Sequence, residues 1–505
     1  MRARLLMIVA VLVVAGMFSS SGVGVPPEVG ASSEAGPWYY RQQLAWGSCA
    51  GDVFFVRSAE CARLAVPLDY AKPDGARVSL GVLRHRVERA DRRIGALVVS
   101  PDGPGDSGMS LAAGVAYQLA AEPLRDRFDL VGFDARGVGA SRPLVACLPD
   151  QALDALRALP AEPTAEPTVD SSAEVVAVGE LLADGCAKDT ELLSHVGTRE
   201  TVRDLDVLRA ALGEEKLSYF GRSYGTRVGA AYASAFPGRV RAMVLDGSVH
   251  PTAPPVEQLR AQLTALTAAF TAYATSCARR PDCPVGTDPA VAARELDDLL
   301  ARAPYPVGDR ELSTRDIAYL VTSQLYNSSS WPVLSQLLAD LEHGDAGKLL
   351  ELADRILDRQ ADGSYAAGGL DVRLAVDCVD GEFPADPVAT LTDLRTSAGP
   401  GGTWRLPAVD VEALVCPHWL VPPVAEPITG APDPPPVLVM ATTGDAATPY
   451  ANGVAMAERL GADLVTYEGY RHTVYLASDD CVNRTGHDYL VSLRTPPEHT
   501  RCPGL

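Results

Sequence analysis

The chain has 505 residues, of which 47% are hydrophobic and 21% are charged, and its formal net charge at pH 7 is −20. This composition excludes a disordered protein, and the length favours a large core with an insertion over one simple domain. A surface this acidic argues against binding nucleic acid or anionic membranes. It would instead attract cationic groups, such as the amino terminus of a peptide.

Residues 1–30 have the pattern of a secretory signal peptide and leader. Arg2 and Arg4 precede an apolar run over residues 5–17, and small and polar residues follow. The run is short for a membrane-spanning helix, and no basic stop signal follows it. The sequence therefore predicts a secreted, extracellular protein with no stable membrane association after signal cleavage; an uncleaved membrane anchor is the alternative.

Ten cysteines are present, and an even number in a secreted chain indicates disulfides. The sequence has no Cys-x-x-Cys and no histidine pair at metal spacing, so we expect no metal site. Spacing does not determine connectivity, but proximity in the sequence suggests five pairs: Cys49–Cys61, Cys147–Cys186, Cys277–Cys283, Cys378–Cys416 and Cys481–Cys502.

From residue 66 to residue 246, predicted strands alternate with helices. Residues 66–70 and 78–83 read as an edge hairpin with a turn at 72–76. Apolar runs typical of strands buried on both faces follow at 96–100, 128–134, 216–220 and 240–246. With helices between these runs, the order predicts an α/β fold with a mostly parallel sheet covered on both faces.

The stretch 217–226 contains Gly221-x-Ser223-x-Gly225 between a predicted strand and a segment rich in small residues. The pattern alone is weak, and an ordinary tight turn is the alternative. In this setting it predicts a nucleophile elbow, in which the serine sits on a strained turn at the end of a strand. The flanking glycines fit, because larger side chains there would clash with the strand and the helix.

The loop at residues 101–108 is rich in Gly and Pro and follows a predicted buried strand. An α/β-hydrolase places its second oxyanion donor at this position. Pro104 has no N–H, so the donors predicted for an oxyanion hole are the N–H groups of Gly103 and Tyr224. A plain surface turn is the alternative. Asp134 and Arg136, after the next strand, could be taken for catalytic residues, but a structural ion pair or loop clamp is favoured.

Beyond residue 250 the pattern changes to long helical segments and then returns to strands. We expect a first part of the core at 31–250, a helical cap at 251–424 and the C-terminal part of the core at 425–505. In that last part, strands are predicted at 437–440 and 463–467. Cap insertions of this kind cover a site and determine which substrates fit.

Three polar residues follow predicted strands in the order Ser223, Asp445, His472. This is the chain order of a triad in an α/β-hydrolase, and the carboxyl ends of such strands hold the site. His472 would accept the serine proton, and Asp445 would fix the imidazole tautomer. Asp246, at the end of the preceding strand, is the alternative acid.

The chain resembles the secreted tripeptidyl-aminopeptidase-like branch of the proline iminopeptidase group of α/β-hydrolases. The segments that carry the resemblance are 66–70, 103–105, 128–137, 221–226, 375–378, Cys416 with Trp419, and 436–502. The resemblance implies a Ser223–His472–Asp445 triad that releases short peptides or residues from a free amino terminus, without a cofactor. It also implies acidic residues that hold the substrate ammonium, for which Asp377 and Asp380 are candidates.

Two departures from that group stand out. Ser100, Asp102 and Asp106 occupy positions of the oxyanion loop where Asn, Gly and Gly are usual, and Arg471 stands where a glycine commonly precedes the histidine. A carboxylate pointing inward would repel an oxyanion, or it could help to bind an amine. Two other functions therefore stay open: an esterase or amide hydrolase acting on small acyl substrates, and a binding protein on a disabled hydrolase scaffold.

Overall fold

The computed structural model describes residues 37–49, 59–119, 123–159, 169–365, 369–399, 402–430, 435–477 and 480–504. The predicted signal peptide and leader lie outside these residues. Within the described ranges, no helix is both long enough and apolar enough to cross a membrane.

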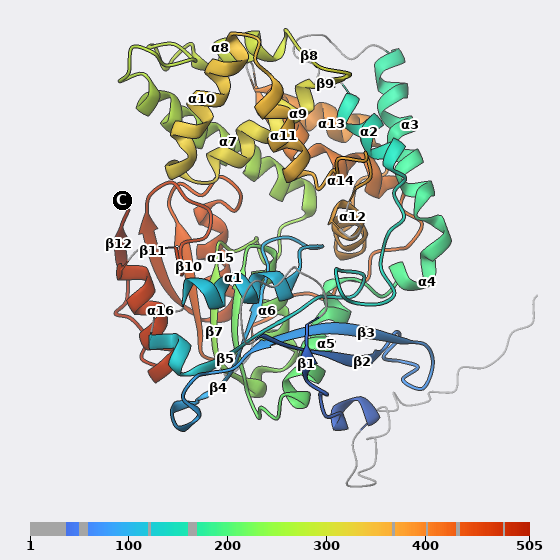
Figure 1. The fold of residues 1–505 in the computed structure, drawn as a ribbon, viewed down its shortest axis with the longest axis vertical. Coiled ribbons are helices and arrows are strands. Elements are labelled where there is room, and N and C mark those ends of the chain that lie inside the picture. Colours follow the sequence, from blue (N-terminus) through green and yellow to red (C-terminus); the bar gives the residue numbers. More distant parts are fainter. Residues whose placement is uncertain are drawn as a thin grey trace, which may run out of the picture.

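A ten-stranded sheet forms the lower half of the molecule in Figure 1. Its order is β1-β2-β3-β5-β4-β6-β7-β10-β11-β12, with antiparallel pairing from β1 to β5 and parallel pairing from β5 to β12. The strands are Gly47–Ser48, Ala59–Pro67, Arg77–His85, Gly95–Ser100, Phe128–Phe133, Leu217–Arg222, Val240–Asp246, Val437–Thr442, Asp463–Glu468 and Arg501–Pro503, for β1 to β7 and β10 to β12. This mostly parallel sheet confirms the predicted fold class.

The sheet differs from the prediction at both of its edges. The first hairpin strand, β2, runs over Ala59–Pro67 and not over 66–70. It ends there because the carbonyls of Pro67 and Leu68 accept hydrogen bonds from Arg136 instead of from a neighbouring strand. At the far edge, β12 adds an unpredicted last strand of three residues.

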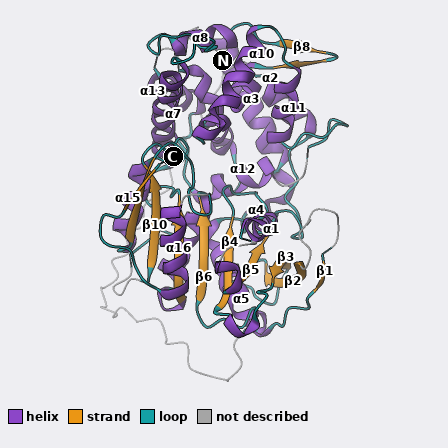
Figure 2. Cartoon of the chain, turned by 60° about the vertical axis from the view of Figure 1, so that its left-hand side comes forward, coloured by secondary structure: helices purple, strands orange, loops and turns teal. Residues whose placement is uncertain are grey.

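Both faces of the sheet are buried, as the continuous apolar strands required. In β6, Tyr219 packs into the core on one face and its neighbour Phe220 packs into the core on the other. Helices cover both faces (Figure 2). They are α1 Gly108–Gln118, α5 Thr198–Ala211, α6 Tyr224–Ala235, α15 Tyr450–Leu460 and α16 Asp480–Ser492.

A layer of helices lies above the sheet and has its own apolar core, which includes Phe270, Leu338 and Trp404 (Figure 1). Between β7 and β10 it contains α7 Pro255–Cys277, α8 Ala292–Leu300, α9 Thr314–Leu325, α10 Trp331–Glu342, α11 Gly347–Ile356, α12 Gly369–Asp380, α13 Pro387–Ala398 and α14 Asp410–Val415, and a hairpin of β8 Tyr305–Val307 with β9 Arg310–Leu312. Two earlier helices, α2 Asp150–Ala158 and α3 Val169–Gly185, pack against α9 and α14, and the short α4 Thr190–Leu193 follows them. The helical layer therefore also includes helices that precede the nucleophile elbow in the sequence.

All five disulfides suggested by sequence proximity are present in the structure. One of them, Cys378–Cys416, ties α12 to the residue that follows α14. These two helices carry the acidic residues described below, so the covalent link fixes their relative position.

Candidate active site

Ser223 lies between β6 and α6, at the turn that the sequence predicted. Its backbone has φ 48° and ψ −115°, a region that side-chain-bearing residues rarely adopt. Gly225 is needed beside it, because a Cβ there would lie 2.9 Å from the Ser100 carbonyl oxygen. The Ser223 N–H donates to the carbonyl of Asp246 at 2.9 Å, which holds the turn against β7. The serine is thus presented on a rigid, strained apex.

His472 and Asp445 contact each other directly. The Nδ1 atom of His472 lies 3.0 Å and 2.9 Å from the two carboxylate oxygens of Asp445. Asp445 is buried and is held in turn by three donors, the N–H groups of Ala447 and Thr448 and the Thr448 hydroxyl. Burial alone would lower the pKa of His472, but the Asp445 carboxylate outweighs it and raises that pKa above its usual value.

Ser223 and His472 line one cavity of about 700 Å³, which we call the elbow cavity. Its walls come from the loops after β4, β6, β10 and β11 and from helices of the upper layer. No hydrogen bond joins Ser223 Oγ to the His472 ring among the described residues, and in free enzymes this bond is often long. The elbow cavity brings the predicted nucleophile and base together beneath the helical layer.

Asp246, the alternative acid, is fully buried but bonds to the backbone and not to the imidazole. Its Oδ2 accepts the N–H groups of Val474 and Tyr475 at 2.7 and 2.8 Å, and its Oδ1 has no partner in the structure. Burial raises its pKa to about 6. Asp246 therefore supports the loop that carries His472, while Asp445 contacts the ring.

Both predicted oxyanion donors already have acceptors inside the protein. The Tyr224 N–H donates to the Asp102 carbonyl at 2.8 Å, and the Gly103 N–H donates to Asp106 Oδ2 at 2.9 Å. The carboxylate of Asp102 forms an ion pair with Arg222 at 3.0 Å. Burial raises the pKa of Asp106. Of the acidic substitutions noted in the sequence, Asp106 therefore closes the loop through its carboxylate, whereas the Asp102 carboxylate pairs with Arg222 at the end of β6.

Asp377 and Asp380, the predicted amine ligands, both line the elbow cavity but differ in their partners. Asp380 accepts hydrogen bonds from the backbone and hydroxyl of Thr198 and lies 3.5 Å from Arg227. The Asp377 carboxyl, on α12, makes no hydrogen bond or ion pair with another described residue. Burial, and then the nearby charge of Glu412, raise its pKa to about 8.

Glu412 is a cavity residue that the sequence reasoning missed. One of its oxygens pairs with Arg373 at 2.5 Å, while Oε2 is buried without a partner. Glu412 lies on the short helix α14 and no motif surrounds it. Only its proximity to the disulfide-linked Cys416 could have placed it near Asp377.

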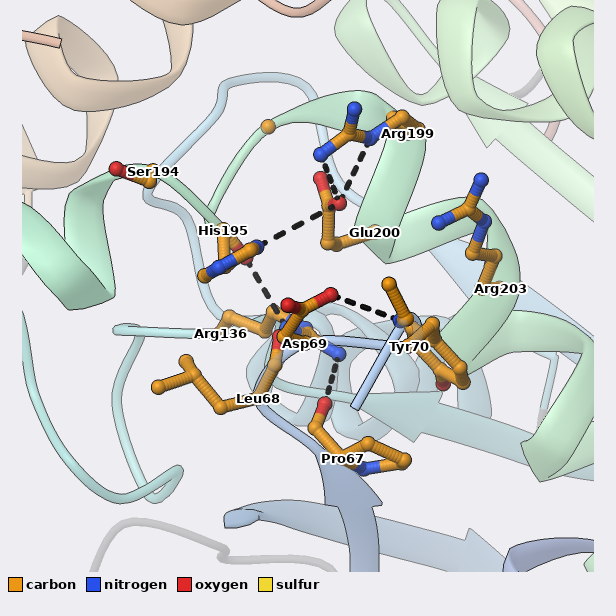
Figure 3. Close-up of polar contacts among 12 residues, drawn as sticks. Pro67, Leu68, Asp69, Tyr70, Arg136, Ser194, His195, Arg199, Glu200 and Arg203 are labelled. Carbon is orange, nitrogen blue, oxygen red and sulfur yellow. Dashed lines mark hydrogen bonds and ion pairs between the residues drawn. The ribbon is translucent and has the colours of Figure 1, made fainter. Parts of the chain in front are cut away.

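Asp134 and Arg136 have the structural roles that the sequence favoured. Arg136 is completely buried and pairs with Asp204 through two hydrogen bonds of 2.6 and 2.8 Å. It also donates to the carbonyls of Pro67, Leu68 and His195, three residues that Figure 3 shows around it. Asp134 accepts the Ser107 hydroxyl at 2.6 Å at the start of α1. Both residues hold loops in place, and neither lines the elbow cavity.

Known proteins share this architecture and sequence. Residues 103–479 match the family model described as alpha/beta hydrolase fold. The chain is 38% identical to serine protease Hip1 of Mycobacterium tuberculosis, with 99% of this chain and 98% of that protein covered. It is 38% identical to carboxylesterase B of the same organism (95% and 94% covered) and 32% identical to tripeptidyl aminopeptidase of Streptomyces lividans (92% and 87% covered).

The fold and these relatives define a serine hydrolase. The chain belongs to the α/β-hydrolase fold family. Within that family it is tripeptidyl-aminopeptidase-like, as the sequence resemblance implied.

Proposed function

We propose that this protein is a secreted aminopeptidase that releases short peptides, of the tripeptidyl type, from free amino termini. The observation that carries the proposal is the elbow cavity, in which Ser223 and the His472–Asp445 pair share a wall with the unpaired carboxyl of Asp377. Relatives named serine protease and tripeptidyl aminopeptidase support the same reading. The five disulfides fit an oxidising compartment outside the cytoplasm.

In this mechanism Ser223 Oγ attacks the scissile carbonyl while His472 Nε2 takes its proton. The imidazolium, stabilised by Asp445, then protonates the leaving amine, and the new amino terminus of the shortened chain departs. A water molecule, deprotonated by His472, hydrolyses the acyl-enzyme and frees the short peptide and Ser223. The strained backbone of the serine fixes the position of its hydroxyl, and the three hydrogen bonds that Asp445 accepts fix the position of the imidazole.

The substrate ammonium would bind between Asp377 and the free oxygen of Glu412. Glu412 is buried and Asp377 is half-buried, so water competes less with an arriving cation there than at an exposed site. An ammonium beside Asp377 favours its ionised form, so binding would release a proton from this carboxyl at neutral pH. A free amino terminus thus becomes the feature that selects the substrate.

The N–H groups of Gly103 and Tyr224 would hold the oxyanion only after the loop at 101–106 gives up its internal bonds. The Asp106 carboxylate must leave the Gly103 N–H, and the Asp102 carbonyl must leave that of Tyr224. Substrate binding would supply this rearrangement, as in enzymes that complete the site on closure.

Two alternatives have specific support. An esterase is supported by the relative named carboxylesterase B and by apolar residues in the elbow cavity, among them Leu156, Leu259 and Phe383. A binding protein on the same scaffold is supported by the occupied oxyanion donors.

One assay panel separates the three. Wild type and Ser223→Ala are tested on tripeptide p-nitroanilides with free and with acetylated amino termini, and on p-nitrophenyl esters. Serine-dependent cleavage only with a free amine supports the aminopeptidase, and ester turnover alone supports the esterase. If no substrate gives a signal that depends on Ser223, both enzyme assignments are wrong.

A further inference from the structure

A second cavity, of about 890 Å³, lies at the junction of α7, the turn before α10 and the loop after β11. We call it the basic cavity, because Arg279 and Arg471 line it and no described lining residue is acidic. The basic cavity and the elbow cavity lie on opposite sides of two chain segments, one at residues 326–327 and one at 471–472. Tyr326 and His472 line the elbow cavity, whereas their sequence neighbours Asn327 and Arg471 line the basic cavity.

Two chain segments, residues 326–328 and 470–472, separate the two cavities and are joined by backbone hydrogen bonds. The His472 N–H donates to the Tyr326 carbonyl at 2.6 Å, and the Ser328 N–H donates to the Tyr470 carbonyl at 2.9 Å. An isolated bridge pairs Asn327 with Arg471. A molecule in the basic cavity would therefore touch the segment that delivers His472.

The chain has 64 acidic residues, but neither guanidinium group forms an ion pair with one that the structure describes. In the described part of the chain, the only hydrogen bond of the Arg471 side chain is to the Thr473 carbonyl at 3.2 Å. By contrast, the adjacent Arg280 pairs with Asp282 at 3.1 Å. Arg279 is exposed and Arg471 is half-buried where they line the cavity. Two cations at one cavity attract an anion, because guanidinium groups bind carboxylates through paired hydrogen bonds.

The remaining walls fit a peptide-sized organic anion. The rings of Trp331 and Tyr470 lie 5.5 Å apart and offer flat apolar surface, and Trp331 Nε1 is buried with no acceptor in the structure. On α7, Ala268 and Ala272 leave space between them. Aromatic rings pack well against peptide side chains, and the indole N–H can donate to a carbonyl.

We propose that the basic cavity binds the carboxylate end of a short peptide. The choice of a peptide as the ligand rests on the proposed function, whereas recognition of a carboxylate rests on the two arginines alone. The carboxylate belongs either to a separate product-like peptide or to the far end of the substrate itself.

Direct binding tests this without turnover. N-acetyl-alanyl-phenylalanine and its carboxamide are titrated into the Ser223→Ala protein at low salt by calorimetry; acetylation removes the ammonium that the elbow cavity would bind. We expect the acid to bind about tenfold more tightly than the amide, since one charge-assisted contact is worth this much. Arg279→Gln should remove the difference, and the matched variant Arg280→Gln should keep it.

Three results would overturn the proposal: equal affinity for acid and amide, no binding of the acid up to about 10 mM, or retention of the preference in Arg279→Gln. A second arm identifies the source of the carboxylate. If KM of the wild type differs between free-acid and amidated substrates and the difference is lost in Arg279→Gln, the substrate's own terminus occupies the cavity. If KM does not differ while the acetylated acid still binds, a separate peptide occupies it.

Discussion

The elbow cavity and the basic cavity share one wall but have opposite chemistry. Three arginines and seven acidic residues line the elbow cavity, the latter being Asp102, Asp106, Asp358, Asp371, Asp377, Asp380 and Glu412. The basic cavity has two arginines and no acid among its described residues. The net charge of the chain, −20, therefore does not determine whether a cavity is acidic or basic. The local charge depends on which charged side chains line the cavity and on which of them are paired.

Pairing separates groups that hold the fold from groups left for a ligand. Asp380 and Arg136 are buried and bonded on all their charged atoms, and Asp246 is buried and bonded through one carboxylate oxygen. Removal of one partner from such a group leaves a costly unpaired charge. The side chains of Asp377 and Arg279 have no such partners among the residues that the structure describes. The comparison predicts that substitutions of unpaired groups change binding, whereas substitutions of paired groups change stability or loop position.

The largest effect should come from Asp445, and its comparison is Asp246, the other aspartate that supports the His472 segment. We expect Asp445→Asn to lower kcat by about 10⁴, because the imidazole would lose its correct tautomer. Asp246→Asn keeps an oxygen for the N–H groups of Val474 and Tyr475, so we expect a loss of no more than about tenfold. Steady-state kinetics on the best substrate of either type measures both.

The two variants also control each other, since both remove one buried negative charge near His472. A small loss in Asp445→Asn with a large loss in Asp246→Asn would transfer the role of the acid to Asp246.

The next effect concerns the unpaired acid of the elbow cavity. Asp377→Asn should raise KM for substrates with a free amine by about 30-fold, equivalent to ~2 kcal/mol, and leave ester turnover within about twofold. In the wild type, 1/KM for these substrates should rise with pH as Asp377, whose pKa is about 8, ionises, and should fall again above about pH 8 as the substrate ammonium, with a pKa of about 7.7–8.0, loses its proton. This rise should be absent in Asp377→Asn.

Asp380→Asn is the matched comparison on the same helix. Because Asp380 holds Thr198, we expect a lower melting temperature with little change in KM. Equal increases in KM for both variants would contradict the distinction between paired and unpaired acids.

A smaller effect is expected at the oxyanion loop. Asp106→Asn keeps an oxygen for the Gly103 N–H but removes a negative charge close to where the oxyanion forms. We expect kcat to rise about tenfold, which corresponds to ~1.4 kcal/mol of the barrier. Asp74→Asn, in the exposed turn between β2 and β3, is the control. A fall in kcat would mean that the carboxylate takes part in catalysis or in amine binding.

The elbow, the strand order and the disulfide pairs could be read from the sequence, because each depends on local pattern or on short separation along the chain. The partners of side chains could not. Glu412 and Asp377 come together through the packing of α12 on α14, with the Cys378–Cys416 disulfide and the Arg373–Glu412 ion pair across that contact. The closure of the oxyanion loop depends on where the Asp106 side chain points. The basic cavity could not be predicted from the sequence either, because Arg279 and Arg471, which line it together, are 192 positions apart.

The smallest effect is a shift in pH dependence that tests the shared wall itself. Protonated His472 cannot accept the serine proton, so kcat/KM falls as pH falls through its pKa, which Asp445 holds above the usual 6.5. An ester substrate is used for this profile, because it carries no ammonium and Asp377 does not enter. In the Ser223→Ala background, NMR of labelled histidine should show that Asp445→Asn moves this pKa downward, since burial then acts without the opposing carboxylate. An unchanged His472 titration would mean that Asp445 does not control the base, and the acid would have to be sought among the other carboxylates near the ring.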